Sequence, residues 1–261
     1  MIKPRRCETR AWTRAAVALG TLPFQAFAQQ PFHHPSILPG HNLTTAEFFR
    51  DLGKTFQALP TVPNIAPVVA GGAAYGLGTI WDQSLERHFA PGDVWGKWAA
   101  PGKYIGHPLI LGGVSGTLFA ISRGSDDVRF RSFSYALLQS SIVSSAIVQP
   151  TKAMFQRLRP SGENKHSFPS GHATDAFLYA TVAMEHYGWK AGIPAYAAST
   201  YVAMSRLADR KHHITDVIAG AALGYLIGRT ASGRMKLPSK ITANLRASGN
   251  GFGAQIQIGL P

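Results

Sequence analysis

The chain has 261 residues, of which 45% are hydrophobic and 15% are charged, so it can bury a substantial core and is not a disordered protein. Its single cysteine excludes a disulfide scaffold and a cysteine-based zinc finger. The formal net charge of +13 favours an anionic partner, either a nucleic acid or a phosphate-bearing molecule or membrane.

The first 28 residues have the pattern of a secretory signal peptide. Five basic residues precede an apolar stretch over residues 15–22, and Ala26-Phe27-Ala28 matches a small-x-small cleavage site. An uncleaved anchoring helix is the alternative interpretation. Cleavage before Gln29 would remove Cys7 and lower the net charge to +9. We therefore expect export to the cell envelope, in the periplasm or a membrane, which favours phosphate groups or anionic lipids over nucleic acid as partners.

The segment after the signal peptide predicts a leader and one short helix. Residues 29–42 are rich in Pro and His, and we interpret them as a solvated leader because no carboxylate or cysteine accompanies the histidines. Thr44 and Glu47 have capping-box spacing, which predicts an amphipathic helix to about Leu59 that ends before Pro60.

Three uncharged stretches follow at residues 62–81, 105–122 and 133–151. Each is 18–20 residues long, enough in principle to cross a bilayer, although their Gly, Ser and Ala content weakens that prediction. Between the first two lies a Gly- and Pro-rich segment that we interpret as a loop. Its rings, Trp95, Trp98 and Tyr104, would lie at a membrane interface, line a substrate opening or pack against helix ends.

Shorter apolar helices are predicted at residues 172–187, 192–206 and 213–229. Pairs or triplets of glycine at four-residue spacing, which let helix backbones approach closely, occur at Gly72 and Gly76, at Gly112 and Gly116, and at Gly220, Gly224 and Gly228. The tail differs, because apolar and polar residues alternate over 241–247 and 252–260 around Asn250-Gly251. This pattern predicts a β-hairpin.

The first of three segments suited to phosphate chemistry contains Lys152, Arg159 and Pro160. Residues seven apart on a helix return to nearly the same face, so both cations would point the same way. Pro160 disfavours a helical Arg159, so we expect the helix to end there, where positive charge is favourable.

The second segment is Phe168-Pro169-Ser170-Gly171-His172, at the start of an apolar helix. Ser170 can cap that helix, and Gly171 allows an oxyanion to approach the backbone N–H groups of the first turn. His172 lies beside them, where it could exchange a proton with a bound group.

The third segment contains Ser205-Arg206, His212 and Asp216. The four-residue spacing predicts that His212 and Asp216 share one helix face, so the carboxylate could fix the ring tautomer and leave the other nitrogen as a nucleophile or base. Arg206 would add a third cation, and the neighbouring His213 should point about 100° away from the site.

These segments resemble the three-part motif K-x6-RP, PSGH and SR-x5-H-x3-D of the type 2 phosphatidic acid phosphatases. That family shares its fold and site with bacterial class A acid phosphatases and vanadium haloperoxidases. The motif is matched without substitution over 65 residues, from 152 to 216.

The resemblance implies a role for each matched residue. Lys152, Arg159 and Arg206 would hold the phosphate oxygens together with Ser170 and the Gly171 amide. His212 would attack phosphorus to form a phosphohistidine, oriented by Asp216. His172 would protonate the leaving alkoxide and then activate water. The resemblance implies no metal and no cofactor, and none of the three segments contains a carboxylate pair suited to Mg²⁺.

We therefore predict an all-α bundle of about six helices with a short C-terminal β-hairpin. The expected division is a signal peptide over 1–28, a leader and short helix over 29–59, the phosphatase domain over 60–230 and the hairpin tail over 231–261. The expected activity is metal-independent hydrolysis of phosphomonoesters or pyrophosphates, with a lipid phosphate as substrate, association with a membrane and no nucleic acid partner.

Two alternatives use the same residues. A soluble periplasmic acid phosphatase of broad specificity is favoured by the signal peptide, by Glu185 and His186 within a catalytic helix and by a mean hydropathy of −0.01. A vanadate-dependent haloperoxidase would use His212 as the vanadate ligand, but the haloperoxidases of this family are usually much longer.

Overall fold

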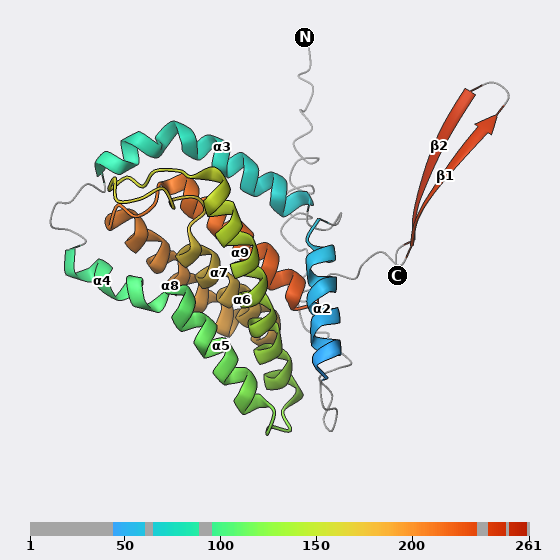
Figure 1. Ribbon diagram of the computed structural model, residues 1–261, viewed down its shortest axis with the longest axis horizontal. Helices are drawn as coiled ribbons and strands as arrows, with labels where there is room; N and C mark the ends of the chain where they lie inside the picture. The colour runs from blue at the N-terminus through green and yellow to red at the C-terminus, as the bar shows by residue number, and fades with distance from the viewer. Residues whose placement is uncertain (1–43, 61–64, 89–95, 234–239, 249–250, 260–261) are drawn as a thin grey trace, which may run out of the picture. The chain divides into compact units, whose positions relative to one another are not determined.

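The computed structural model describes residues 44–60, 65–88, 96–233, 240–248 and 251–259 (Figure 1). The predicted signal peptide, the histidine-rich leader and Trp95 lie outside these residues. The all-α class is confirmed, but the described residues form eight helices rather than about six. The helices are α2 (Thr45–Ala58), α3 (Ile65–His88), α4 (Gly96–Ile105), α5 (Pro108–Ser122), α6 (Val128–Phe155), α7 (Gly171–Tyr187), α8 (Trp189–Ala208) and α9 (Ile214–Ala231).

Helix α2 confirms the predicted capping box. The backbone N–H of Glu47 donates to Thr44 Oγ1 at 3.2 Å, and the backbone N–H of Thr44 donates to Glu47 Oε2 at 2.9 Å. Two N–H groups that the helix itself leaves without partners are thus satisfied. The helix contacts α6, where the Tyr135 hydroxyl donates to the buried Asp51 at 3.1 Å.

Helix α7 packs against α6, α8 and α9. The core lies where α6, α7 and α9 meet. The fully buried side chains there are Leu137 and Val143 of α6, Leu178 and Val182 of α7, and Ile227 of α9. Burial of each side chain contributes about 1.5–3 kcal/mol. The start of α7, with Ser170 and His172, is therefore held by a rigid framework.

The glycine spacing of α9 corresponds to a close contact with α7. A Cβ added at Gly220 would lie 2.6 Å from the Ser170 carbonyl oxygen, and one at Gly228 would lie 2.9 Å from the Leu178 carbonyl oxygen. The close approach expected at the earlier glycine pairs is wrong among the described residues, because a Cβ there would meet none of their atoms within 4 Å. Those pairs are Gly72 with Gly76 and Gly112 with Gly116.

Helix α4 lies in the segment predicted to be a loop, and that prediction is wrong for residues 96–105. Added Cβ atoms at Gly102 and Gly106 would overlap the side chains of Ser205 and Val202 on α8. Packing of this glycine face against α8 overrides the low helix propensity of its glycines and of Pro101.

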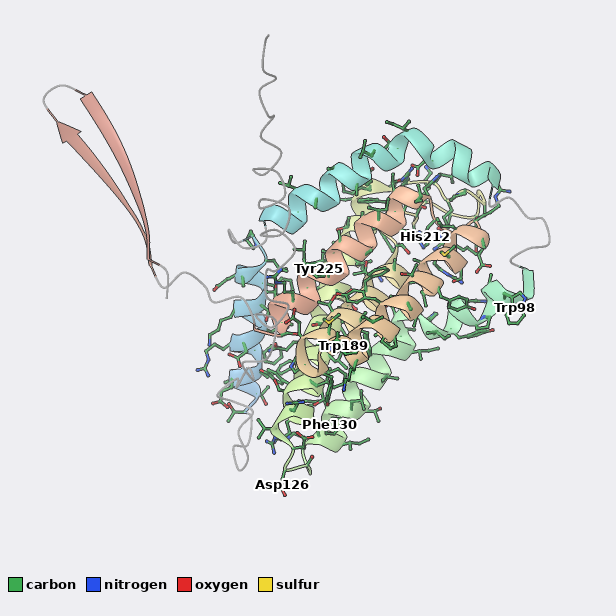
Figure 2. All side chains as sticks on the ribbon, turned by 180° about the vertical axis from the view of Figure 1, so that it is seen from behind. Trp98, Asp126, Phe130, Trp189, His212 and Tyr225 are labelled. Atoms are coloured by element: carbon green, nitrogen blue, oxygen red, sulfur yellow. The ribbon has the colours of Figure 1, made fainter. Side chains whose placement is uncertain are left out.

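Two rings of α4 are exposed: Trp98, at the edge of the domain in Figure 2, is 74% exposed, and Tyr104 is 61% exposed. No single helix among the described residues is both long enough and apolar enough to cross a membrane. Helices α4 and α5 meet these criteria only as a pair, Trp98–Ile105 with Pro108–Ser122, bent by 49°.

The predicted hairpin is present as β1 (Lys240–Ser248) and β2 (Gly251–Gly259), which pair antiparallel. The register pairs Ile241 with Ile258 and Ala243 with Ile256, as the alternating pattern requires. Ser248 pairs with Gly251, so the strands are joined by residues 249–250, one position earlier than predicted.

Candidate active site

The first motif is split between a helix and a loop. Helix α6 ends at Phe155, and its C-cap Gln156 has a left-handed φ of 44°. Lys152 therefore lies in the last turn, whereas Arg159 lies beyond the helix, and the prediction that both share one helix face is wrong. The chain turns four residues before the predicted end, and the Arg159 backbone N–H then donates to the Asn164 carbonyl at 3.0 Å.

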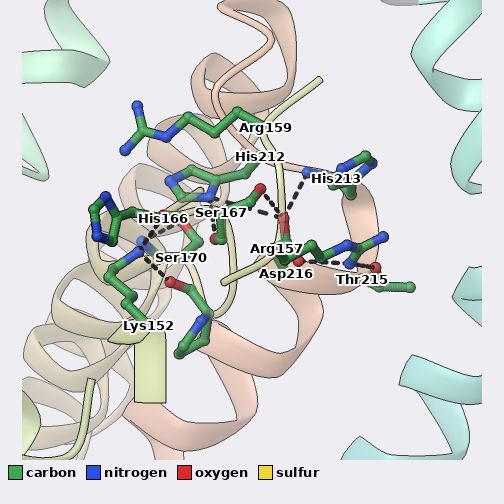
Figure 3. Close-up of polar contacts among 12 residues, drawn as sticks. Lys152, Arg157, Arg159, His166, Ser167, Ser170, His212, His213, Thr215 and Asp216 are labelled. Carbon is green, nitrogen blue, oxygen red and sulfur yellow. Dashed lines mark hydrogen bonds and ion pairs between the residues drawn. The ribbon is translucent and has the colours of Figure 1, made fainter. Parts of the chain in front are cut away.

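Lys152 connects its helix to the loop that carries the second motif. Its ammonium donates to the carbonyl oxygens of His166 at 2.8 Å and Pro169 at 2.7 Å (Figure 3). An ammonium has three donors, so one remains for a ligand. Burial, together with the positive charge of Arg159, lowers the pKa of Lys152 to about 8.

Arg159 has an unused donor. Its Nε is buried and has no hydrogen-bond partner within the described part of the chain. The guanidinium approaches Glu163 at 3.7 Å, which is too long for a hydrogen bond. A buried guanidinium N–H without a partner costs free energy, and an anion bound beside it would remove that cost.

Ser170 caps α7, as predicted, although its Oγ accepts from the Ala173 N–H at a long 3.4 Å. The Ser170 backbone N–H donates to the Asp216 carbonyl at 3.0 Å, which joins the start of α7 to the first turn of α9. Gly171 is the first residue of α7, so its amide lies at the positive end of the helix.

His172 is the second residue of α7 and is partly buried. Its Nε2 lies 3.2 Å from the Lys103 carbonyl oxygen of α4, and its ring meets that of His107 edge to face at a centroid distance of 5.5 Å. Burial lowers the pKa of His172 to about 4, and the positive charge of Arg206 adds to the effect. The ring is therefore neutral near pH 7 without a bound anion.

His212 lies two residues before α9, so the prediction that it shares a helix face with Asp216 is wrong. Its Nδ1 lies 2.6 Å from the Ser167 carbonyl oxygen and 3.9 Å from Asp216 Oδ2. Because a carbonyl oxygen can only accept, Nδ1 carries the hydrogen and Nε2 keeps a free lone pair. Burial, with the charges of Lys152 and Arg159, lowers the pKa of His212 well below its usual value.

Asp216 is fully buried and makes other contacts than predicted. It accepts from Arg157 Nη1 at 2.6 Å, from the His213 backbone N–H at 2.9 Å and from the Ser167 hydroxyl. The bond to His213 caps α9, which explains why the helix begins only after His212. The carboxylate thus fixes the loop that holds His212 and acts on the ring by its charge.

Arg206 lies in the last turn of α8, as predicted, and is buried. Its Nη2 donates to Asp209 Oδ2 at 2.6 Å and its Nε to Ser205 Oγ at 3.2 Å. Its charge acts on His172, as does that of Lys152, and the charges of Lys152 and Arg159 act on His212. The eight predicted site residues come from α6, α7, α8, α9 and the loops before α7 and α9. Figure 3 shows five of them: Lys152, Arg159, Ser170, His212 and Asp216.

Several residues of the site were missed from sequence. Arg157 lies within the first motif, and Ser167 lies just before the second, so local position could have suggested both. Asp82 of α3 is far away in sequence and had no local signal. It accepts from Arg157 Nη2 at 2.8 Å and from both the backbone N–H and the hydroxyl of Thr215, at 3.2 and 2.8 Å.

Among the residues that the structure describes, no group of three or more His, Cys, Asp or Glu side chains could hold a metal ion. The charge of the site comes from Lys, Arg and a helix N-terminus, which suit an oxyanion.

Comparison with known proteins gives a family match for part of the chain. Residues 133–236, which contain all three motif segments, match the PAP2 superfamily. Over 85 residues, 31% of this chain, the sequence is 36% identical to a lipid A 1-phosphatase of Porphyromonas gingivalis, of which it covers only 19%.

A solved structure is also similar, a transmembrane PAP2-type phosphatidylglycerolphosphate phosphatase from Bacillus subtilis. The similarity has a TM-score of 0.49 at 19% identity and covers 69% of this chain and 94% of that one. The match to the PAP2 superfamily covers residues 133–236, which is less than half of the chain.

Proposed function

We propose that this protein is a metal-independent phosphatase that hydrolyses phosphomonoesters or pyrophosphates of lipids through a phosphohistidine at His212. The observation that carries the proposal is the neutral, buried His212, which has one free ring nitrogen and is acted on by the charges of Lys152 and Arg159. The buried Nε of Arg159 has no hydrogen-bond partner among the described residues. A neutral imidazole next to a cationic anion site is suited to nucleophilic attack on phosphorus.

In the first step, the Nε2 lone pair of His212 attacks phosphorus and the bond to the leaving oxygen breaks. Lys152, Arg159 and Arg206 hold the other phosphate oxygens, with the N–H groups at the start of α7. Nδ1 keeps its hydrogen and continues to donate it to the Ser167 carbonyl. The positive charge that develops on the ring is stabilised by the nearby carboxylate of Asp216.

His172 supplies the proton that the leaving oxygen needs. Its low pKa leaves it neutral in the free protein, but a phosphate dianion would raise that pKa and promote protonation. In the second step, neutral His172 accepts a proton from water, whose oxygen attacks phosphorus while the Nε2–P bond breaks. Phosphate is released and both histidines return to their starting states.

The surface near His172 supports a lipid as the leaving group. Lys103, whose carbonyl contacts His172, is followed by the exposed Tyr104 and Ile105, and Leu109 is 81% exposed. Exposed apolar side chains of this kind favour contact with acyl chains, and an aromatic ring beside a lysine favours the interfacial layer of a membrane. The proposal therefore includes association with a membrane of the cell envelope.

The test of the mechanism separates the two histidines. After rapid quenching with a ³²P-labelled substrate, the unaltered protein should carry an acid-labile label on the peptide containing His212. His212→Ala should lose both label and turnover. His172→Ala should still be labelled by p-nitrophenyl phosphate, whose leaving group needs little protonation, and then hydrolyse slowly. Label on the peptide containing His172 would show that the roles are reversed.

Vanadate and chelators test the absence of a metal. Vanadate mimics the trigonal-bipyramidal transition state and should inhibit, whereas EDTA should leave activity unchanged. Activity lost in EDTA and restored by Mg²⁺ or Zn²⁺ would overturn the mechanism.

Substrate comparison tests the lipid assignment against a broad-specificity acid phosphatase. Phosphatidic acid or a polyprenyl pyrophosphate in mixed micelles should be hydrolysed with a higher kcat/KM than glycerol phosphate. Equal values would favour the broad-specificity alternative. Sequencing of the mature N-terminus tests export, since cleavage of the signal peptide should leave Gln29 first.

A further inference from the structure

A buried charge cluster lies behind His212, on the side opposite its free nitrogen. It consists of two carboxylates, Asp82 and Asp216, joined by the guanidinium of Arg157 at 2.8 and 2.6 Å. Asp216 is fully buried and Asp82 is 7% exposed. The cluster connects α3, the loop after α6 and the first turn of α9.

The charges of this cluster do not cancel. Arg157 carries one positive charge, whereas Asp82 and Asp216 carry two negative ones, so the net charge is −1. If Asp82 were neutral, the pair of Arg157 and Asp216 would have no net charge. Asp82 therefore supplies the excess negative charge of the buried region that faces His212.

His212 has a specific need for such a charge. Lys152 and Arg159 lie close enough to disfavour a positive ring. Bonding of phosphorus to Nε2 leaves Nδ1 protonated, so the imidazole becomes cationic. The neutral Ser167 carbonyl accepts the Nδ1 hydrogen but brings no charge of its own. A net negative cluster is the feature of the described residues that can balance the new cation.

We propose that Asp82 is a positioning residue that acts through Arg157 and Asp216 and stabilises phosphorylated His212 by its charge. This inference rests on the proposed phosphohistidine mechanism and extends it to α3, which lies outside the segment 133–236 that matches the superfamily. Asp82 also accepts the Thr215 backbone N–H, so one side chain both caps α9 and sets the charge behind its first turn.

The test compares three substitutions. Asp82→Asn keeps the shape but removes the charge. Thr215→Val removes the hydroxyl that contacts Asp82 and Arg157 but leaves every charge in place. Asp51→Asn removes a buried carboxylate of α2, which contacts Tyr135 and Lys54, and serves as the matched control. Each variant is assayed for the rate of phosphoenzyme formation and for inhibition by vanadate and by inorganic phosphate.

Asp82→Asn should slow phosphoenzyme formation about 10-fold to 100-fold and weaken vanadate inhibition by a similar factor. Inhibition by phosphate, which Lys152, Arg159 and Arg206 bind without a bond to His212, should change less than about threefold. Thr215→Val and Asp51→Asn should keep the preference for vanadate over phosphate. If Thr215→Val loses this preference as Asp82→Asn does, or if neither variant loses it, the charge role is wrong.

Should Asp82→Asn not fold, Asp82→Glu takes its place, because it keeps the charge. It should retain the preference for vanadate within about threefold, and a tenfold loss would overturn the inference. Failure of the proposed function gives a different result, namely an unaltered protein that forms no phosphoenzyme. An unaltered protein that is phosphorylated, beside an Asp82→Asn variant phosphorylated equally fast, would refute only the role of Asp82.

Discussion

Replacing Gly220 by alanine tests how closely α9 packs against α7. Alanine in a helix is normally favoured over glycine by about 1 kcal/mol. Here its Cβ would lie 2.6 Å from the Ser170 carbonyl oxygen, about 0.8 Å short of the 3.4 Å at which ordinary contact begins. That oxygen belongs to the backbone and accepts the Thr174 N–H, so it cannot move freely.

The overlap should therefore outweigh the gain in helix propensity. Overpacking of a rigid contact typically costs about 1–3 kcal/mol, and a clash with backbone lies at the upper end of that range. We expect a net loss of about 2 kcal/mol, which corresponds to a decrease in Tm of about 4–8 °C for a domain of this size. Gly113→Ala is the control, because its Cβ would meet no atom of the described part of the chain within 4 Å, and it should raise the Tm slightly.

Thermal unfolding followed by circular dichroism at 222 nm measures both variants. Gly220→Ala should also lower kcat, since the displaced residue is Ser170, whose N–H joins the α7 start to Asp216. A Tm that rises equally in Gly220→Ala and Gly113→Ala would show that α7 and α9 are not in backbone contact at this position.

Three further predictions concern pH. Because the pKa of Lys152 is about 8, inhibition by inorganic phosphate should weaken as the pH rises above 8, and Lys152→Arg should abolish this break in a plot of log Ki against pH. Binding of phosphate near pH 6 should be accompanied by proton uptake, because the anion raises the pKa of His172. Calorimetry in buffers of different ionisation enthalpy measures this uptake. Proton uptake that is unchanged in the His172→Asn variant would contradict the assignment. Buried His172 and His212 resist protonation in the folded state, so the unfolded chain binds more protons below pH 6.5. The free energy of unfolding, measured with urea, should therefore fall by on the order of 1–3 kcal/mol from pH 6.5 toward pH 4. The fall should be smaller in the His172→Asn variant.

The local sequence determined the residue types of the site and most of the helices. The capping box at Thr44, the helix starting after Ser170 and the presence of a C-terminal hairpin all follow from short-range patterns, and the structure confirms them. Such patterns are predictive because capping and hydrophobic periodicity involve residues only a few positions apart. The spacing of the three motif segments similarly predicts the cations and both histidines of the candidate site.

Tertiary structure decided how these residues contact one another. The sequence pairs His212 with Asp216, but the His212 ring donates to the Ser167 carbonyl, from a loop 45 positions away. Asp82 reaches Thr215 across 133 positions, and no local pattern marks it. Helix α4 forms against local propensity because Gly102 and Gly106 allow close packing on α8. In each case the partner of a buried polar group or a glycine face is set by how the helices pack together, because the contacts join residues that are distant in sequence.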